Sequence, residues 1–310
     1  MIPARECLEP KMLDVGTARL RTARFSADPT HLERGVCVLL NGQTEFIEKY
    51  FEVIDELRGR GFAVAALDWR GQGGSGRLVA SAPLRVHIDD FAEYDADLSA
   101  FMDQIVAPML SGDARPIAVA HSMGGHILLN YLNRNPLRFT ACAFCAPLLM
   151  YSTRGQPRWF VRAVTNTMML LGRSKDGVWG MEGRDPLTMT FDRQIVTSDR
   201  ARFQRTQDFL KLHPDLRSSG PTWGWVAAAD RALARFALPG FAEQISIPAL
   251  ILGAGRDRVT VSEAAKRFAA RMPACVYQCI QDAEHEILME RDELRAQFWQ
   301  GFDRFMDLYL

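Results

Sequence analysis

The stretch RPIAVAHSMGGHILLNYL, residues Arg115 to Leu132, places a small polar serine between two apolar segments. The run from Ile117 to His121 is typical of a buried parallel strand, and the residues after Ser122 have helical spacing. Alanine stands two residues before this serine, and glycine two residues after it. The pattern fits either a tight turn whose small residues serve packing, or a nucleophile held on a strained elbow between strand and helix.

The segments on either side repeat this alternation. Apolar runs predict strands at residues 16–25, 35–42, 62–70, 116–121, 139–147, 247–253 and 274–280, and amphipathic patterns predict helices at 48–61, 89–105, 123–135 and 291–310. We expect residues 16–25 to form an antiparallel edge strand. The other strands predict an α/β fold with a mostly parallel sheet and helices on both faces.

The middle of the chain has a different character. Between residues 152 and 242 strand-like runs disappear, and helical stretches alternate with loops rich in glycine and proline. A connection of this length between sheet strands is uncommon unless it has a structure of its own. We therefore expect a core domain formed by residues 1–151 and 243–310, and an inserted helical cap over residues 152–242.

Composition excludes several classes of protein. The 310 residues carry 37 Lys and Arg against 37 Asp and Glu, so no net charge attracts nucleic acid. The first residues lack the apolar core of a secretion signal, and no run reaches the roughly 18 to 20 apolar residues of a membrane span. Six cysteines are too few for a disulfide scaffold, so we expect free thiols and a cytoplasmic location.

The segment GQGGSG, residues 71–76, matches the G-x-G-x-x-G pattern of dinucleotide-binding loops. That pattern has to open a helix, because the phosphates bind the free amides of the first helical turn. The residues that follow contain Pro83 and have no helical face. We therefore interpret this segment as a surface loop.

A serine hydroxyl needs a base, and the base needs an acid to orient it. Hydrolases with this kind of elbow place the acid and then the histidine after the serine. His285, between the last strand and the last helix, meets this order, whereas His213 falls in the expected cap. For the acid we choose Asp257, which follows the strand at 247–253, over the alternatives Asp230 and Asp282.

Two backbone amides are candidates for stabilising a negatively charged oxygen at this site. The helix after Ser122 directs its first amides toward the site, which nominates Met123. The loop after the strand at 35–42 nominates Gln43, because Gly42 permits the required turn.

These segments, in this order, resemble the lysophospholipase and monoacylglycerol lipase branch of the α/β-hydrolase fold. The resemblance rests on residues 41–76, AHSMGGH at 120–126, GAGRDRV at 253–259 and AEHEIL at 283–288. It covers most of the chain outside the expected cap, and it explains DWRGQGGSG as that family's D-x-R-G-x-G-x-S loop. Two positions depart from the family, which often has histidine at Asn41 and glycine at Ala120.

The resemblance implies a serine ester hydrolase that acts on a small-molecule acyl ester, in particular a single-chain lipid, without metal or organic cofactor. Other hydrolases of the same fold remain as alternatives: a short-chain carboxylesterase, a thioesterase or a prolyl aminopeptidase-like peptidase. A binding protein without catalysis is the alternative from another class.

One segment of the expected cap suggests a membrane partner. Residues 152–175 carry five basic residues and no acidic one, interleaved with aromatic residues, methionines and leucines. Such side chains suit an acyl chain, and arginines suit a phosphate or an anionic bilayer surface. An ordinary cap helix with its apolar side on the core is the alternative. Contact with the inner membrane face through the cap is therefore our hypothesis.

Overall fold

A computed structural model describes residues 9–180 and 185–310 of the chain. Its centre is a sheet of eight strands in the order β1-β2-β4-β3-β5-β6-β7-β8. The strands are β1 (Glu9–Val15), β2 (Ala18–Phe25), β3 (Gly35–Leu40), β4 (Phe62–Leu67), β5 (Ile117–His121), β6 (Cys142–Cys145), β7 (Ala249–Ala254) and β8 (Cys275–Ile280). All neighbours from β4 to β8 pair in parallel, which confirms the mostly parallel sheet.

The predicted edge strand is antiparallel, but its edge position was wrong. β2 pairs with β4 on one side and with β1 on the other, so β1 is the edge. Sequence reasoning missed β1 because Pro10, Lys11 and Asp14 interrupt its apolar pattern. Leu13 lies opposite Leu20 in the register, and both side chains are buried.

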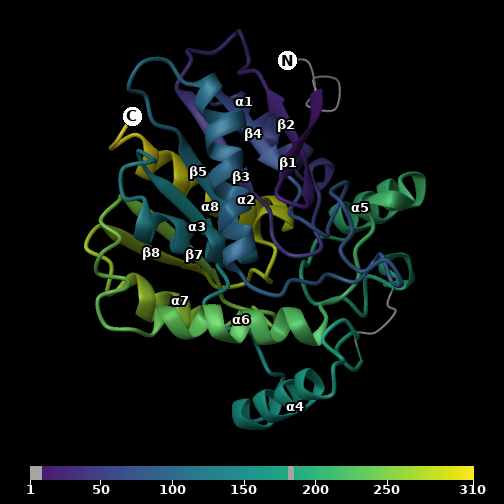
Figure 1. Cartoon of the computed structure of the whole chain (residues 1–310). Helices are drawn as coiled ribbons and strands as arrows, with labels where there is room; N and C mark the ends of the chain where they lie inside the picture. Colours follow the sequence, from purple (N-terminus) through teal and green to yellow (C-terminus); the bar gives the residue numbers. More distant parts are fainter. Residues whose placement is uncertain (1–8, 181–184) are drawn as a thin grey trace.

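Helices cover both faces of the sheet, as predicted (Figure 1). One face packs against α1 (Phe51–Arg58) and α8 (Asp292–Met306). The other packs against α2 (Ala92–Phe101), α3 (Ser122–Arg134), α6 (Trp223–Phe236) and α7 (Ser262–Ala269). Successive side chains of β3 point to opposite faces of the sheet, so Val38 belongs to one core cluster and Leu39 to the other. Short helical turns lie at 47–50, 102–109, 186–188, 214–216 and 287–289.

No strand occurs between residues 152 and 242 in the part of the chain that the structure describes. This region contains α4 (Arg158–Leu170), α5 (Arg200–Leu212) and α6. α4 lies outermost, beyond α6 (Figure 1), whereas α6 places Trp225 and Ala229 in a core cluster of the sheet. The boundaries of the proposed cap at residues 152 and 242 remain a prediction.

The loop at residues 71–76 opens no helix, but the expectation that it lies on the surface was wrong. Gly71 and Gly73 are buried and have φ angles of 78° and 50°, which favour glycine. A side chain at Gly73 would lie 2.4 Å from the carboxylate of Asp68. The same carboxylate accepts a hydrogen bond from the amide of Gly74. The glycines therefore allow the backbone of this loop to pack closely around the Asp68 carboxylate.

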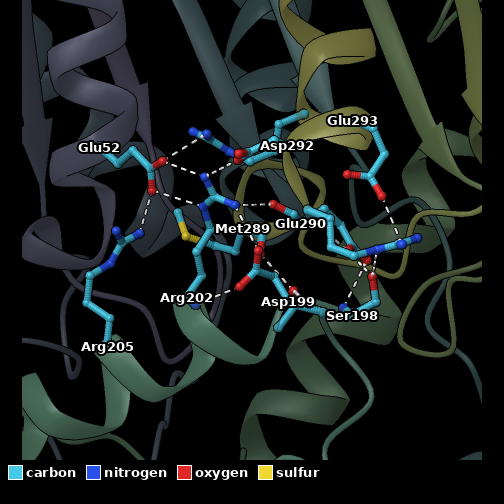
Figure 2. Close-up of polar contacts among 12 residues, drawn as sticks. Glu52, Ser198, Asp199, Arg202, Arg205, Met289, Glu290, Asp292 and Glu293 are labelled. Atoms are coloured by element: carbon cyan, nitrogen blue, oxygen red, sulfur yellow. Dashed lines mark hydrogen bonds and ion pairs between the residues drawn. The ribbon is translucent and has the colours of Figure 1, made fainter.

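A cluster of charged residues joins α5 to the core (Figure 2). Arg202 pairs with Glu52 of α1 at 2.6 Å and with Asp199 at the start of α5 at 2.9 Å. Arg202 also pairs with Asp292 at 2.6 Å and donates to the carbonyl of Glu290, just before α8. This ionic cluster holds the N-terminal end of α5 against two helices of the core.

Candidate active site

Ser122 lies where β5 ends and α3 begins, as the sequence predicts. Its φ angle of 49° falls in the left-handed region, which is strained for a residue with a side chain. Gly124 is required in this turn, because a Cβ there would lie 2.5 Å from the carbonyl oxygen of Leu40. The elbow is therefore crowded as well as strained.

The structure brings the three predicted side chains together. The Oγ of Ser122 lies 2.9 Å from Nε2 of His285, and Nδ1 of His285 lies 2.8 Å from Oδ2 of Asp257. Asp257 follows β7 and His285 follows β8, so both lie beyond the carboxyl ends of parallel strands. All three side chains are largely shielded from solvent. This arrangement can transfer a proton from the hydroxyl to the imidazole.

Asp257 is held in its charged form. Burial by itself would raise the pKa of its carboxyl, but the hydrogen bond and charge of His285, with donors from Thr260, outweigh burial and lower that pKa. The Thr260 hydroxyl donates to Oδ2 at 2.6 Å, and the amides of Val259 and Thr260 donate to Oδ1. The carboxylate is thereby fixed in orientation as well as in charge.

The alternative candidates have other partners. Asp230 accepts a hydrogen bond from the hydroxyl of Tyr151, and Asp282 forms an exposed ion pair with Arg256. His213 lies at the end of α5, stacked on Phe209.

The two amides nominated for an oxyanion lie beside the serine. Met123 is the second residue of α3, where a backbone N–H has no acceptor within the helix. Within the described residues, the backbone amide of Gln43 donates no hydrogen bond. Gln43 also lines a cavity together with Ser122. The role of both amides remains a prediction.

This cavity, of about 400 Å³, opens between the core and the proposed cap, and Ser122 and His285 lie in its wall. Apolar side chains from the region between residues 185 and 212 form much of the rest, among them Met189, Ile195, Val196, Phe203 and Leu210. Its size and its mixture of apolar surface with a few polar groups are typical of small-molecule sites.

Known proteins are similar to this chain in sequence and in fold. A family model described as serine aminopeptidase, S33 matches residues 32–292. The chain belongs to this family. Lysophospholipase L2 of Escherichia coli (strain K12) is 33% identical over 296 residues, which cover 93% of this chain and 84% of the relative. A monoacylglycerol lipase of Mycolicibacterium smegmatis is 26% identical over 226 residues, covering 73% and 71%.

Solved structures agree on the fold. A soluble variant of monoglyceride lipase from Saccharomyces cerevisiae superposes with a TM-score of 0.77 at 17% identity, over 98% of this chain and 96% of that one. The predicted α/β-hydrolase fold and the predicted resemblance to the lysophospholipase and monoacylglycerol lipase branch are thereby confirmed.

Sequence reasoning missed a buried group of charges behind the site of this S33-family hydrolase. The carboxylate of Glu45 accepts hydrogen bonds from the amide of Gly42, from the Tyr50 hydroxyl at 2.6 Å and from Nδ1 of His121 at 2.9 Å. Lys49 bridges Glu45 at 2.8 Å and Glu286 at 2.6 Å. We call Glu45, Lys49, His121 and Glu286 the buried charge group.

The buried charge group connects three loops of the site. Glu45 binds the loop of Gln43, His121 directly precedes Ser122, and Glu286 directly follows His285. In addition, Nε2 of His121 lies 3.3 Å from the carbonyl oxygen of His285. In the sequence, only His121 could have indicated this group. It is a polar residue between Ala120 and Ser122, at the end of an apolar run.

The charges in this group support one another. Burial by itself would raise the pKa of Glu45 and lower that of His121. The cations Lys49 and His121 outweigh burial at Glu45, so its pKa falls well below the usual range. Glu45 in turn raises the pKa of His121 above its ordinary value.

Glu45→Gln should destabilise the fold by about 3 kcal/mol, because it leaves buried cations without their shared carboxylate.

The pKa of His121 is raised from 6.5, so its contribution to stability is complete below pH 6.5 and disappears as pH rises through the folded-state pKa. Glu45→Gln should remove this decline. Urea unfolding between pH 6 and pH 9 measures both effects, with the exposed Glu293→Gln as control; equal pH slopes in all three proteins would contradict the prediction.

Proposed function

We propose that Ser122, His285 and Asp257 perform acyl transfer in this carboxylic ester hydrolase. The observation that carries the proposal is the continuous chain of hydrogen bonds from Ser122 Oγ through His285 to Asp257, located in the wall of a cavity. Asp257 holds the imidazole so that Nε2 faces the hydroxyl.

The reaction has two halves. Ser122 Oγ attacks the ester carbonyl while Nε2 of His285 takes the hydroxyl proton, and the negative oxygen of the tetrahedral intermediate binds the amides of Gln43 and Met123. The intermediate collapses to an acyl-Ser122 ester, and the imidazolium returns the proton to the departing alcohol. Water then attacks the acyl group by the same route, which releases the carboxylic acid and restores Ser122.

The substrates are acyl esters of single-chain lipids. The relative at 33% identity is named a lysophospholipase, and the relative at 26% a monoacylglycerol lipase. The apolar wall of the cavity offers an acyl chain a contact surface next to Ser122. A soluble short-chain ester or a peptide has no long acyl chain to place against this wall.

Ser122→Ala should lower ester hydrolysis about 10⁶-fold, the size of the loss when a serine protease loses its nucleophile. Labelling by a fluorophosphonate probe should disappear as well. The thermal midpoint should stay close to wild type, because among the described side chains the hydroxyl forms a hydrogen bond only with His285. Turnover at the wild-type rate would overturn the assignment, and an unlabelled wild-type protein would favour a binding protein without catalysis.

Asp257→Asn should lower kcat about 10⁴-fold, because an amide in place of the carboxylate stabilises the wrong imidazole tautomer. Asp230→Asn and Asp282→Asn serve as matched controls and should retain activity. Single-turnover rates with one soluble ester give the comparison. If either control is inactive while Asp257→Asn is active, the acid has been assigned to the wrong residue.

We also propose that α4 binds the inner face of an anionic membrane. In the described residues, no helix is long and apolar enough to cross a bilayer. α4 instead exposes apolar side chains to solvent: Trp159 is 71% exposed, Leu170 89% and the adjoining Leu171 65%. Arg158 and Arg162 are also exposed and belong to the same helix.

This exposure decides how the segment at 152–175 would act. Of these residues only Arg154 lines the cavity, so the aromatic residues and leucines of α4 do not reach an acyl chain inside the site. Exposed apolar side chains beside arginines instead suit the interface of an anionic bilayer. The five cysteines that the structure describes are free thiols, which supports a location in a reducing cytoplasm.

Charge reversal at Arg158 and Arg162 should weaken binding to vesicles of mixed phosphatidylcholine and phosphatidylglycerol, by about 1 kcal/mol for each lost basic contact and more from repulsion. It should raise KM for micellar lysophospholipid and leave a short soluble ester unaffected. Arg24→Glu with Arg115→Glu, two exposed sites outside α4, gives a control of equal net charge. Equal vesicle binding by both double variants would contradict a specific role of α4.

A further inference from the structure

Almost every charged side chain in the wall of the cavity has a partner. Asp185 pairs with Arg217, and Glu45 and Glu286 share Lys49. Arg202 also lines the cavity, and its partners are those of the ionic cluster in Figure 2.

Two arginines in this wall have no such partner among the described residues. Within residues 9–180 and 185–310, the guanidinium groups of Arg154 and Arg193 form neither an ion pair nor a hydrogen bond, and only their backbone amides donate. Both residues are exposed, although they line the same cavity as Ser122 and His285. They therefore lie where the cavity opens to solvent, and their guanidinium donors have no partner among the described residues.

The backbone holds Arg154 in place near the acid of the triad. Its φ angle is 52°, in the left-handed region, and the turn around it is closed by a bond from the amide of Gln156 to the carbonyl of Thr153. The amide of Ser152 donates to the carbonyl of Val259 at 2.8 Å, only two residues from Asp257. A residue with a side chain is strained in this conformation, and such positions cluster at functional sites.

Arg193 is held near the histidine of the triad. The amide of Arg193 donates to the carbonyl of Thr190, and the segment that follows is tied to the loop of His285. The amide of Glu286, next to His285, donates to the carbonyl of Val196 at 2.7 Å. The two guanidinium groups thus belong to segments that are hydrogen-bonded to the two loops carrying Asp257 and His285.

We propose that Arg154 and Arg193 bind the phosphate of a lysophospholipid head group while its ester carbonyl lies at Ser122. Guanidinium donors match phosphate oxygens in geometry, and charge-assisted hydrogen bonds of this kind are strong. The apolar wall then takes the acyl chain, so one substrate spans both halves of the cavity. The inference rests on the proposed function and specifies it: the pair selects phosphate-bearing lipid esters over neutral monoacylglycerols.

The test compares two substrates with the same medium-length acyl chain, a lysophosphatidylcholine and a monoacylglycerol, each below its critical micelle concentration so that membrane binding plays no part. Arg154→Gln and Arg193→Gln should each lower kcat/KM for the lysophospholipid about 10- to 100-fold, mainly through KM, as expected for the loss of a charge-assisted hydrogen bond. Hydrolysis of the monoacylglycerol should change less than twofold. Arg24→Gln, an exposed arginine outside the cavity, is the matched control.

The outcomes separate this inference from the proposed function. If wild type hydrolyses neither lipid, the proposed function fails. If wild type hydrolyses both and the variants lose equally on both, or lose nothing, the phosphate site is wrong. Inhibition of lysophospholipid hydrolysis by inorganic phosphate is a further test. Inhibition only at phosphate concentrations far above the KM of the lysophospholipid supports a head-group site. Inhibition at concentrations near that KM would reassign the pair to free phosphate.

Discussion

The close approach of β3 to the elbow at Ser122 is the constraint on which the site depends. Gly124 brings the first turn of α3 against the end of β3, where the carbonyl of Leu40 leaves no room for a Cβ. Ser122 is consequently forced to a φ angle of 49°, with its hydroxyl at the end of the sheet. The carboxyl ends of β7 and β8 lie at the same edge, so the loops that follow them deliver Asp257 and His285 to that hydroxyl. The parallel sheet thus does the positioning, and the loops supply the chemistry.

The buried charge group contributes to the site in a second way. It connects three separate loops whose relative positions have to be maintained. Apolar contacts alone would fix the loops' distance but not their rotation, since dispersion has no preferred direction. The hydrogen bonds of Glu45 do have directions, and they end on Gly42, Tyr50 and His121. Removing ions from water is costly unless each is fully paired. Every member of this group has a partner of opposite charge, so the group can orient the three loops without leaving an unpaired ion.

How much of this could be predicted from the sequence follows from the range of each interaction. Buried parallel strands such as β5 and β7 are continuous apolar runs, and the elbow has a local pattern around Ser122, so both were predictable. Other features depend on partners far away along the chain. Lys49 and Glu286 are 237 residues apart, and neither has a local signal. β1 was missed because its burial depends on β2 rather than on its own polar sequence. The amphipathic pattern of α4 was visible, but a pattern alone does not say whether solvent or protein faces its apolar side.

The ionic cluster of Arg202 has a consequence for how the N-terminal end of α5 could part from the core, whereas farther along this helix Leu210 packs with Phe46 in an apolar contact. Where two elements meet through hydrocarbon surfaces, parting them exposes apolar area to water at roughly 25 cal/mol per Å². At the N-terminal end of α5 the meeting groups are guanidinium and carboxylate, and Asp292 is already 86% exposed. Water solvates such groups well once they are released, although the Arg202 side chain is only 12% exposed while the contact is closed. This contact is therefore directional when closed, yet it puts little hydrocarbon into water when it opens.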